Sequence, residues 1–447
     1  MSYKIYLLSL GCPKNLVNSE QMLAILKNGG MEIVESPEKA DAAIVNTCGF
    51  IDAAKEEAIN AILSLAALKS EGGLSALVVT GCLAERYKDE FLRELPEVDA
   101  VLGTGSYQNI LEAVQGAMEH CAPIELFAPQ ESSPIEGERV LLTPKYSAYL
   151  KIAEGCDNRC SYCVIPSLRG AYRSLPLEEL VSRAEALAAE GVRELLIVAQ
   201  DITRYGTDIY GRRMLAELLR RLCGIEGVRW IRLHYLYPDE IDDELLRVVA
   251  ENDKILKYFD SPLQHINDRI LKEMNRRGGG ALIRERIDRI RSLMPDSVIR
   301  TSLIVGFPGE TEDEFEELYD FLAEYRLERV GVFAYSREEG TPAADMPEQV
   351  PEPVKEARRV RLYSLQEEIM NEHSASLTGK TLTVLCCGRD ESGRQYGRSY
   401  MDAPEIDGAV YFEEESAAEG DFIDIRIDRA EGCDLYGTAE SGRRRKL

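Results

Sequence analysis

Histidine is scarce in this sequence, with four residues among 447. A structural zinc ion usually takes four ligands, commonly from two C-x-x-C pairs or from Cys together with His. The densest group of cysteines, at Cys156, Cys160 and Cys163, has no such partner, because the next histidine along the chain is His234. The shortage of histidine therefore disfavours a zinc site there and leaves zinc as the minor alternative.

Long apolar runs and positive charge are also in short supply. No apolar run reaches the roughly 18 residues that a membrane-spanning helix needs, so we expect no membrane association. Lys and Arg number 53 against 78 Asp and Glu, which gives a formal net charge of −25. Such a field repels phosphate backbones and attracts basic partners. The composition therefore disfavours general nucleic-acid binding and favours a basic protein partner.

Cysteine, by contrast, is abundant, with 11 residues. The first segment has a single Lys and an apolar stretch too short for a secretory signal, so we interpret it as a first β-strand. In a reducing compartment, clustered cysteines more often bind metal than form disulfides. We therefore expect a cytoplasmic protein with reduced thiols.

Three thiols follow the apolar run at residues 149–153 with the spacing C-x-x-x-C-x-x-C, at Cys156, Cys160 and Cys163. Thiolates this close along the chain can converge on one metal centre. An iron–sulfur cluster is normally held by four Cys, so three leave one iron with an open position where a small molecule can chelate. The pattern favours a cluster that takes part in chemistry.

A second set of cysteines is spread over the first 120 residues. Apolar runs at residues 5–10, 42–46, 76–80 and 100–102 alternate with amphipathic stretches, which predicts a parallel α/β sheet. Cys12, Cys48 and Cys82 each follow one of the first three strands. The carboxyl ends of strands line the ligand crevice of such a sheet, so a second iron–sulfur centre is predicted there. The alternative is that these thiols are ordinary buried core residues.

Six further apolar runs predict a β/α barrel of six units instead of eight, with strands at 148–153, 194–199, 230–236, 255–259, 298–305 and 330–334. Barrel chemistry takes place at the carboxyl ends of the strands. Polar and glycine residues gather at those ends: Gln200, Asp201, His234, His265 and the turn at 306–309.

Each of these candidates has a structural alternative. The histidines are more often hydrogen-bonded structural residues than catalysts. The turn at 306–309 has the alternative of a plain strand-to-helix connection capped by Thr311. Arg159, Arg169 and Arg173 are either a solvated face or a group that binds an anionic substrate side chain.

Short strands with glycine turns at 381–386, 410–412, 422–429 and 435–438 predict a small β-barrel near the end of the chain. Before the basic run at 443–446, this module has six basic residues and 15 acidic ones: Asp390, Glu391, Asp402, Glu405, Asp407, Glu413, Glu414, Glu415, Glu419, Asp421, Asp424, Asp428, Glu431, Asp434 and Glu440. An acidic surface of this kind is expected to meet a basic partner. Its alternative is a merely solubilising role.

The predicted fold is therefore a multidomain α/β plus β protein. It has an N-terminal parallel α/β sheet domain at residues 1–120, a linker at 121–144, a partial, six-unit β/α barrel core at 145–372 and a small β-barrel at 375–442.

Several motifs resemble those of the radical S-adenosylmethionine (SAM) methylthiotransferase family. They are the cysteine motif with Tyr162 before its third Cys, SLGCPKN at 9–15, NTCGFI at 46–51, VIPSLRG at 164–170 and PLQH at 262–265. The resemblance covers essentially the whole chain: a methylthiotransferase N-terminal domain, a radical SAM core and a C-terminal TRAM domain. The phrases are similar to the branch that modifies an aspartate of the basic ribosomal protein S-twelve. The chain differs at Asn18, where we expect Asp in that branch.

The resemblance implies two 4Fe-4S clusters and SAM. Cys156, Cys160 and Cys163 would hold the cluster that cleaves SAM to a 5′-deoxyadenosyl radical, and Cys12, Cys48 and Cys82 the auxiliary cluster that presents methylated sulfur. Other contacts to the cofactor are expected from Tyr162, Gln200, Asp201 and Gly306. The implied product is a 3-methylthioaspartate, and the implied reductant is a protein such as flavodoxin or ferredoxin.

Two other functions stay open at this point. One is the same chemistry on a tRNA adenosine, which the acidic C-terminal module disfavours because a tRNA enzyme is expected to have a basic one. The other is a non-catalytic iron–sulfur protein, which would bind iron without cleaving SAM.

Overall fold

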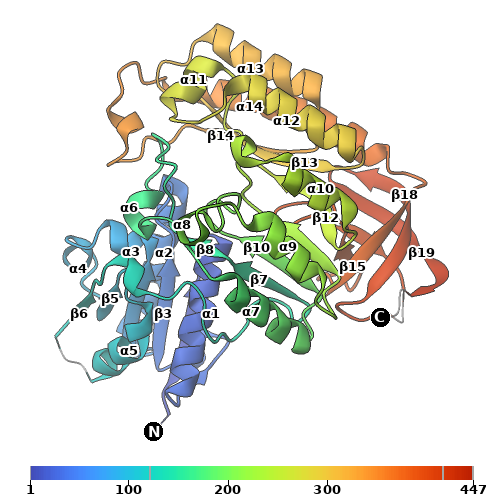
Figure 1. The fold of residues 1–447 in the computed structure, drawn as a ribbon. Helices are drawn as coiled ribbons and strands as arrows, with labels where there is room; N and C mark the ends of the chain where they lie inside the picture. The colour runs from blue at the N-terminus through green and yellow to red at the C-terminus, as the bar shows by residue number, and fades with distance from the viewer. Residues whose placement is uncertain (1, 120–121, 415–416, 445–447) are drawn as a thin grey trace.

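The computed structural model describes residues 2–119, 122–414 and 417–444. Three parts follow one another along the chain: an N-terminal sheet domain, a core with a six-stranded sheet and a closed C-terminal barrel (Figure 1). Among the described residues, no helix is both long enough and apolar enough to span a membrane.

The N-terminal domain is a six-stranded parallel sheet with helices on both faces. One face packs on α1 (Pro13–Asn28) and α5 (Ile110–Met118), and the other on α2 (Asp52–Ser70), α3 (Cys82–Arg86) and α4 (Phe91–Glu94). The predicted α/β sheet is confirmed. Its strand order is β2 (Glu32–Ile33), β1 (Lys4–Ser9), β3 (Ala42–Thr47), β4 (Ala76–Gly81), β5 (Ala100–Leu102) and β6 (Ile124–Leu126).

The N-terminal sheet extends further along the chain than the sequence predicts. β6 lies within residues 121–144, which the composition indicates to be a linker, and it pairs in parallel with β5. Its three residues are half-buried or exposed, so the segment lacks the apolar run that predicts a strand. β2 is missed for a similar reason, because it has two residues at the opposite edge of the sheet. The boundary at residue 120 is therefore too early.

The core is a sheet of six parallel strands, and every strand that the sequence predicts there is present. Its outer face packs on helices α7 (Leu177–Ala189), α9 (Leu215–Cys223), α10 (Asp243–Glu251), α12 (Gly279–Leu293), α13 (Glu312–Tyr325) and α14 (Glu352–Ala375). The short helices α6 (Ile165–Arg169), α8 (Thr207–Tyr210) and α11 (Asp268–Glu273) lie in the connections. The strand order is β14 (Arg329–Ala334), β13 (Val298–Val305), β12 (Ile255–Asp260), β11 (Trp230–Leu233), β10 (Glu194–Val198) and β7 (Ser147–Lys151).

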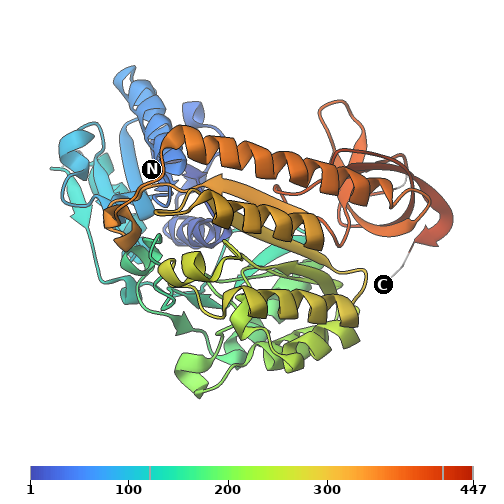
Figure 2. The ribbon, with the colours of Figure 1, turned by 90° about the horizontal axis from the view of Figure 1, so that it is seen from above.

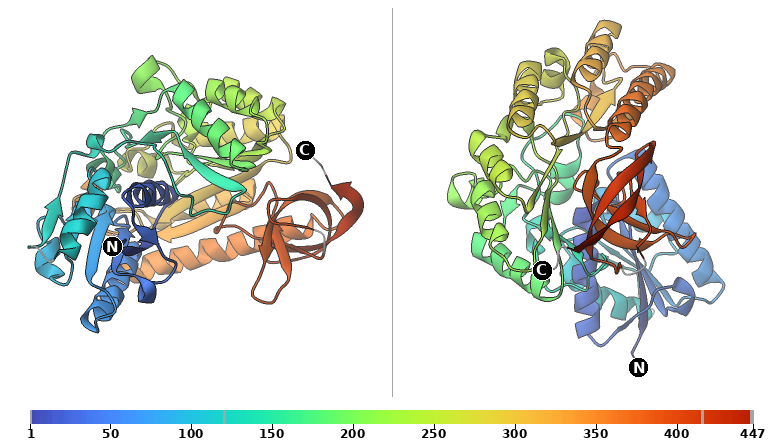
Figure 3. Two further views of the ribbon diagram at one scale, coloured as in Figure 1. Left: turned by 90° about the horizontal axis from the view of Figure 1, so that it is seen from below. Right: turned by 90° about the vertical axis from the view of Figure 1, so that its right-hand side faces the viewer.

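Side chains alternate along each strand, so they point to the two faces of the core sheet in turn. The outer face packs against the helices of the core, and the inner face packs against the N-terminal domain and the C-terminal barrel. Tyr149 of β7 and Leu196 of β10 lie on the inner face and pack against Val17 of α1. Helix α1 is in contact with β7, and the left view of Figure 3 shows this helix end-on in dark blue. Trp230 of β11 and Tyr258 of β12 join the apolar core of the C-terminal barrel. Side chains from both flanking domains therefore cover the inner face of the core.

The C-terminal module is a closed barrel, which confirms the predicted small β-barrel. Helix α14 connects it to the core and packs against both β14 and β18 (Phe422–Glu431) (Figure 2). Strand β16 (Gln395–Arg398) is not predicted because its four residues include no aliphatic side chain. The strand order is β15 (Thr381–Arg389), β16 (Gln395–Arg398), β17 (Val410–Phe412), β19 (Asp434–Arg444) and β18 (Phe422–Glu431).

The acidic surface of this barrel is smaller than the sequence suggests. Asp402 pairs with Arg329 of the core at 3.1 Å, and Asp407 accepts a hydrogen bond from Tyr258 at 2.6 Å. Asp424 is buried within the barrel. Glu415 and the side chains of the basic run at 443–446 lie outside the described residues. The acidic residues that are clearly exposed include Glu391, Glu405, Glu413 and Glu419.

Buried ion pairs join the barrel to the core. Glu194 of β10 is fully buried and accepts hydrogen bonds from Arg232 of the core, at 3.1 Å, and from Arg398 of the barrel. Arg232 also donates to the Tyr400 carbonyl oxygen at 2.8 Å. Burial alone would raise the pKa of Glu194, but Arg398 and Arg232 outweigh it and lower the pKa to about 2. The Glu194 carboxylate is thus charged at neutral pH and holds the two domains together.

Glu194→Gln should strongly destabilise the contact between core and barrel. Removing one partner of a buried ion pair leaves the remaining charges uncompensated and costs about 3–5 kcal/mol. Trp230, the single tryptophan, packs edge-on against Phe422 of the barrel with ring centroids 4.9 Å apart. Its fluorescence during urea unfolding therefore measures the change.

The matched control is Glu178→Gln, which breaks an exposed ion pair with Arg221 and should leave the urea midpoint unchanged. Equal midpoints for the two variants would contradict the role of Glu194 in joining the domains. Because the pKa of Glu194 is depressed, its contribution is present above the ordinary value of 4.5 and is lost as the pH falls toward about 2.

Candidate functional site

Three cysteines gather at the carboxyl edge of the N-terminal sheet. Cys12 is the N-cap of α1, Cys48 follows β3, and Cys82 is the first residue of α3. The neighbouring Gly11 has a φ of +87°, and a Cβ there would lie 2.7 Å from the Cβ of Cys48. Only glycine lets the chain that carries Cys12 approach Cys48 this closely. The structure therefore brings these strand ends together.

Buried cations stand beside these thiols. Burial and the neighbouring Cys82 and Cys12 sulfurs raise the pKa of Cys48 to about 12. Burial also opposes ionisation of Cys12, but Lys14 and Arg169 outweigh it and lower the pKa of that thiol. Both cations are themselves buried. Positive charge in this position suits an anionic metal–thiolate centre.

The second set of cysteines lies on a loop whose base is closed by a short ribbon. β8 (Ala153–Glu154) pairs antiparallel with β9 (Arg173–Ser174), a ribbon that the sequence pattern does not predict. Between these strands, Gly155 has a φ of +82°, and a Cβ there would lie 2.1 Å from the Ala171 carbonyl oxygen. The two halves of the loop approach too closely for any larger residue. The loop carries Cys156, Cys160 and Cys163.

Two other connections of the core anchor this cysteine loop. The Ser161 N–H donates to the Met274 carbonyl oxygen, which follows α11, at 3.0 Å. The Ser161 carbonyl oxygen accepts from the N–H of Ala343, which follows β14, at 2.9 Å. The loop is thus fixed from both sides of the core.

The thiols of the loop are largely shielded from water. Burial is the main reason that the pKa of Cys156 rises to about 11 and that of Cys163 to about 12. Cys160 Sγ lies 3.6 Å from the Tyr237 hydroxyl and 4.0 Å from a guanidinium nitrogen of Arg276. A buried cation therefore stands beside this set of thiols as well.

A chain of buried polar contacts joins Cys82 to the base of the loop that carries the second set of cysteines. Arg169, at the end of α6, donates to the Cys82 sulfur from two nitrogens at 3.1 and 3.3 Å. Its guanidinium lies 3.6 Å from a carboxylate oxygen of Glu154, which also accepts a hydrogen bond from Lys151 at 2.9 Å. Lys151 in turn donates to Asn18 of α1 at 2.6 Å. The network connects the cysteine loop to the N-terminal domain.

Sequence reasoning gave no role to Glu154 or Lys151. The sequence contained a signal for Lys151, because this charged residue interrupts the apolar run predicted at 148–153. Asn18, the position where the resemblance leads us to expect Asp, lies in the same network. Its Nδ2 is buried and has no hydrogen-bond partner in the described part of the chain.

The three arginines that the sequence grouped together have separate surroundings. Arg159 is exposed, and Arg169 is buried against Cys82. Arg173 donates to the carbonyl oxygens of Gln130 and Glu131, each at 3.1 Å. Neither a shared solvated face nor a shared anion site describes this set, because its members point to different parts of the protein.

Two of the expected cofactor-binding residues contact the cysteine loop or its base. Gln200 follows β10 and donates from Nε2 to Glu154. Its Oε1 is buried without a hydrogen-bond partner among the described groups, which fits a ligand that brings an N–H or O–H donor. The Asp201 carboxylate accepts from Asn158 of the loop at 2.8 Å and from the Thr203 N–H at 3.0 Å. Asp201 is therefore engaged in holding the loop.

The other two expected residues, Tyr162 and Gly306, are linked through one apolar cluster. Tyr162 packs against an apolar cluster that contains Phe307, Ile270 and Met274. Phe307 directly follows Gly306 in the turn after β13. The aromatic residue of the cysteine motif therefore packs against the same apolar cluster as the residue that follows Gly306.

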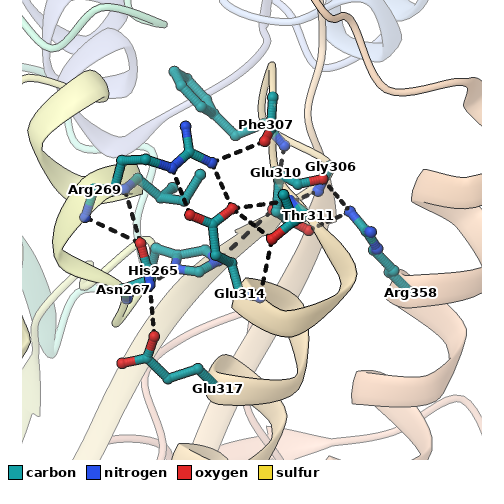
Figure 4. Close-up of polar contacts among 12 residues, drawn as sticks. His265, Asn267, Arg269, Gly306, Phe307, Glu310, Thr311, Glu314, Glu317 and Arg358 are labelled. Carbon is teal, nitrogen blue, oxygen red and sulfur yellow. Dashed lines mark hydrogen bonds and ion pairs between the residues drawn. The ribbon is translucent and has the colours of Figure 1, made fainter.

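Figure 4 shows that the turn after β13 is held by its own hydrogen bonds. The Glu310 carboxylate accepts from the Gly306 N–H at 2.8 Å and from Arg358 of α14 at 2.8 Å. Thr311 and Glu314 form a capping box at the start of α13. The structural alternative of a capped strand-to-helix turn is confirmed, and a contact with SAM stays a prediction.

Both candidate histidines have structural partners. His265 is fully buried, its Nδ1 accepts from the Asn267 N–H at 3.0 Å, and burial lowers its pKa to about 3. His234 Nδ1 lies 3.1 Å from Asp260, which also accepts from Arg300 at 2.8 Å. These contacts support the structural interpretation of both residues.

The donor sets suit iron–sulfur clusters better than single ions. Within the described residues, no three His, Cys, Asp or Glu side chains are close enough together to hold one metal ion. In a four-iron cluster each thiolate binds a different iron, so the ligands surround a space instead of meeting at a point. Each set offers three soft thiols with a buried arginine beside one of them, Arg169 or Arg276. The residues therefore fit two such clusters.

Family models match all three parts of the chain. The model described as "Uncharacterized protein family UPF0004" matches residues 4–103, "Radical SAM superfamily" matches 150–322, and "TRAM domain" matches 378–439.

Curated relatives are similar along the full length. The "Ribosomal protein uS12 methylthiotransferase RimO" of Acetivibrio thermocellus is 48% identical over 98% of both chains. The protein of the same name from Pelotomaculum thermopropionicum is 50% identical over 98% of this chain and 99% of its own length.

Solved structures share the fold at much lower identity. The radical S-adenosylmethionine methyltransferase TsrM from Kitasatospora setae, with cobalamin and a [4Fe-4S] cluster bound, gives a TM-score of 0.54 at 14% identity. The match covers 77% of this chain and 74% of TsrM. It supports the predicted radical SAM architecture of the core.

Proposed function

This chain belongs to the ribosomal protein uS12 methylthiotransferase family within the radical SAM superfamily, and we propose that it adds a methylthio group to the β-carbon of an aspartate in uS12. The observation that carries the proposal is the pair of three-thiol sets, one from each domain, with Arg169 bonded both to Cys82 and to Glu154 at the base of the other set's loop. An unactivated C–H bond offers no acidic proton at neutral pH, so the reaction needs the radical chemistry that cofactors supply.

The two sets of thiols have different proposed roles. Cys156, Cys160 and Cys163 would hold the cluster that binds SAM, and Cys12, Cys48 and Cys82 would hold the auxiliary cluster. When bound, these clusters and SAM supply the radical that removes hydrogen from the aspartate and the methylated sulfur that takes its place.

The chain's own residues bind and shield these groups. Lys14 and Arg169 offset thiolate charge in the N-terminal domain, and Arg276 does so in the core. Gln200 offers an acceptor for a donor group of SAM. The apolar cluster around Phe307 excludes water beside Tyr162.

Protein reconstituted without oxygen should bind about eight irons per chain, because two four-iron clusters are expected. Replacing one triad by Ala, at Cys156, Cys160 and Cys163, should halve the iron and abolish reductive SAM cleavage. Replacing the other triad, at Cys12, Cys48 and Cys82, should also halve the iron. This variant should still form deoxyadenosine from SAM when no substrate is present. Chemical iron assay and chromatography of deoxyadenosine measure the two effects.

The matched control replaces three cysteines of the C-terminal barrel, Cys386, Cys387 and Cys433, and should retain all the iron. Full iron in the variant that lacks Cys12, Cys48 and Cys82 would show that these thiols are core packing. Iron binding without any SAM cleavage in the unaltered chain would favour the non-catalytic alternative.

Gln200→Ala should weaken SAM binding about fivefold, because a lost hydrogen bond costs about 1 kcal/mol. The iron content should stay unchanged, since Gln200 offers no thiol. Equilibrium binding of SAM to the reconstituted protein measures the affinity, and Gln108→Ala, at an exposed position of the N-terminal domain, is the control. Equal SAM affinity in both variants would remove Gln200 from the site.

The exposed acidic residues of the barrel are the proposed docking surface for uS12, a basic ribosomal protein. Complementary charge raises the rate of encounter more than the final affinity. A reductant protein such as flavodoxin or ferredoxin would supply electrons, and the proposed compartment is the cytoplasm.

Reversing three of these charges, at Glu405, Glu413 and Glu419, to Lys should slow association with uS12 about tenfold at low salt. Salt weakens such an attraction, because the screening length falls to about 10 Å at 0.1 M. The variant lacks the attracting charges, so its association rate should depend less on salt. Stopped-flow association kinetics measure both effects. The control makes the same charge change on exposed residues in the outer core helices or directly after one of them: Glu185, Glu190 and Glu285.

The two sets of variants distinguish docking from solubility. Equal association rates for them would show that the barrel charges only keep the protein soluble. Tight binding of tRNA by the unaltered protein would move the tRNA alternative ahead.

A further inference from the structure

The guanidinium of Arg169 is the most heavily engaged group between the two sets of cysteines. The side chain is buried, with an exposed fraction of 3%. Besides its two hydrogen bonds to the Cys82 sulfur, it donates to Asn15 and to the Tyr107 hydroxyl, each at 2.9 Å. These contacts fix the plane of the guanidinium and aim two of its nitrogens at one thiol.

The charge of Arg169 is only partly neutralised by its protein neighbours. Glu154 is the nearest carboxylate, at 3.6 Å, but it is shared with Lys151, whose ammonium group lies closer at 2.9 Å. Arg keeps its charge at every ordinary pH, and the one carboxylate beside it lies nearer to a second cation. Part of the positive charge of Arg169 therefore faces the Cys82 sulfur.

The position of Arg169 in the chain links it to the other set of thiols. Helix α6 begins at Ile165, two residues after Cys163, and ends at Arg169. Leu168 of this helix and Val164, which directly precedes it, pack with Cys82. The segment that leaves the cysteine loop of the core thus ends on a thiol of the N-terminal domain.

We propose that Arg169 is a positioning residue for the N-terminal centre, which holds the Cys82 sulfur in place and raises the reduction potential of the cluster bound there. The reduction potential of an iron–sulfur cluster depends on the net charge around it and on hydrogen bonds to its sulfur atoms. Accepting one electron makes the centre more negative, so a fixed positive charge at the sulfur favours the reduced form. The inference rests on the proposed function, because it needs a cluster at this site.

The test isolates the N-terminal centre in the full-length chain. In a parent protein with Cys156, Cys160 and Cys163 replaced by Ala, only that centre should take up iron. Dithionite titration followed by electron paramagnetic resonance then gives its midpoint potential. Three variants are compared with this parent: Arg169→Met, Arg169→Lys and, as a control from the same loop, Arg173→Met.

Arg169→Met should keep the iron of the parent and shift the midpoint to a more negative potential. Arg169→Lys retains a positive charge and should stay closer to the parent. Arg173 donates to carbonyl oxygens of residues 130–133, so its variant should not shift the midpoint.

An Arg169→Met midpoint equal to that of the parent would overturn the proposal. Loss of iron in both Arg169 variants would also overturn it, because the residue would then be needed only for assembly. A parent that binds no iron at all is a different outcome, since it would refute the N-terminal centre of the proposed function itself.

Discussion

On the inner face of the core sheet, Lys151, Glu194 and Arg232 are completely buried. Removing a charged side chain from water costs several kcal/mol unless a partner offsets its charge. The core strands do not supply all of these partners, because Lys151 reaches Asn18 of the N-terminal domain and Glu194 reaches Arg398 of the barrel. The core therefore depends on both neighbours to complete its interior, and Lys151 also bonds to Glu154 at the base of the cysteine loop.

Much of this architecture could be predicted because parallel strands covered on both faces read as continuous apolar runs. β7, β10 and β13 were recognised in this way, as was the sheet of the N-terminal domain. β2, β6 and the ribbon of β8 and β9 were not, since strands of two or three residues depend on their neighbours more than on their own composition.

The site shows the same division. Cys156, Cys160 and Cys163 lie within eight residues of one another, so their spacing alone indicates a shared centre. The contact between Cys82 and Arg169 joins residues 87 positions apart and depends on how two domains pack. No local pattern encodes it, although the burial of Lys151 in an apolar strand marks the region as unusual. His234 and His265 show a mixed case, because Nδ1 of each has a hydrogen-bond partner while Nε2 of each is buried without one among the described residues, so a functional role for them stays a prediction.

Helix α14 has 24 residues, which at 1.5 Å per residue gives a length of about 36 Å. Near its start, Arg358 binds Glu310 in the turn after β13, and its far end packs against β18 of the barrel. A continuous helix bends only gently over this length, so the two ends keep a nearly constant separation. A substrate that docks on the barrel must therefore present its target side chain on a segment long enough to extend to the cysteine loop. Recognition then depends on the length of that segment as well as on the charge of the substrate.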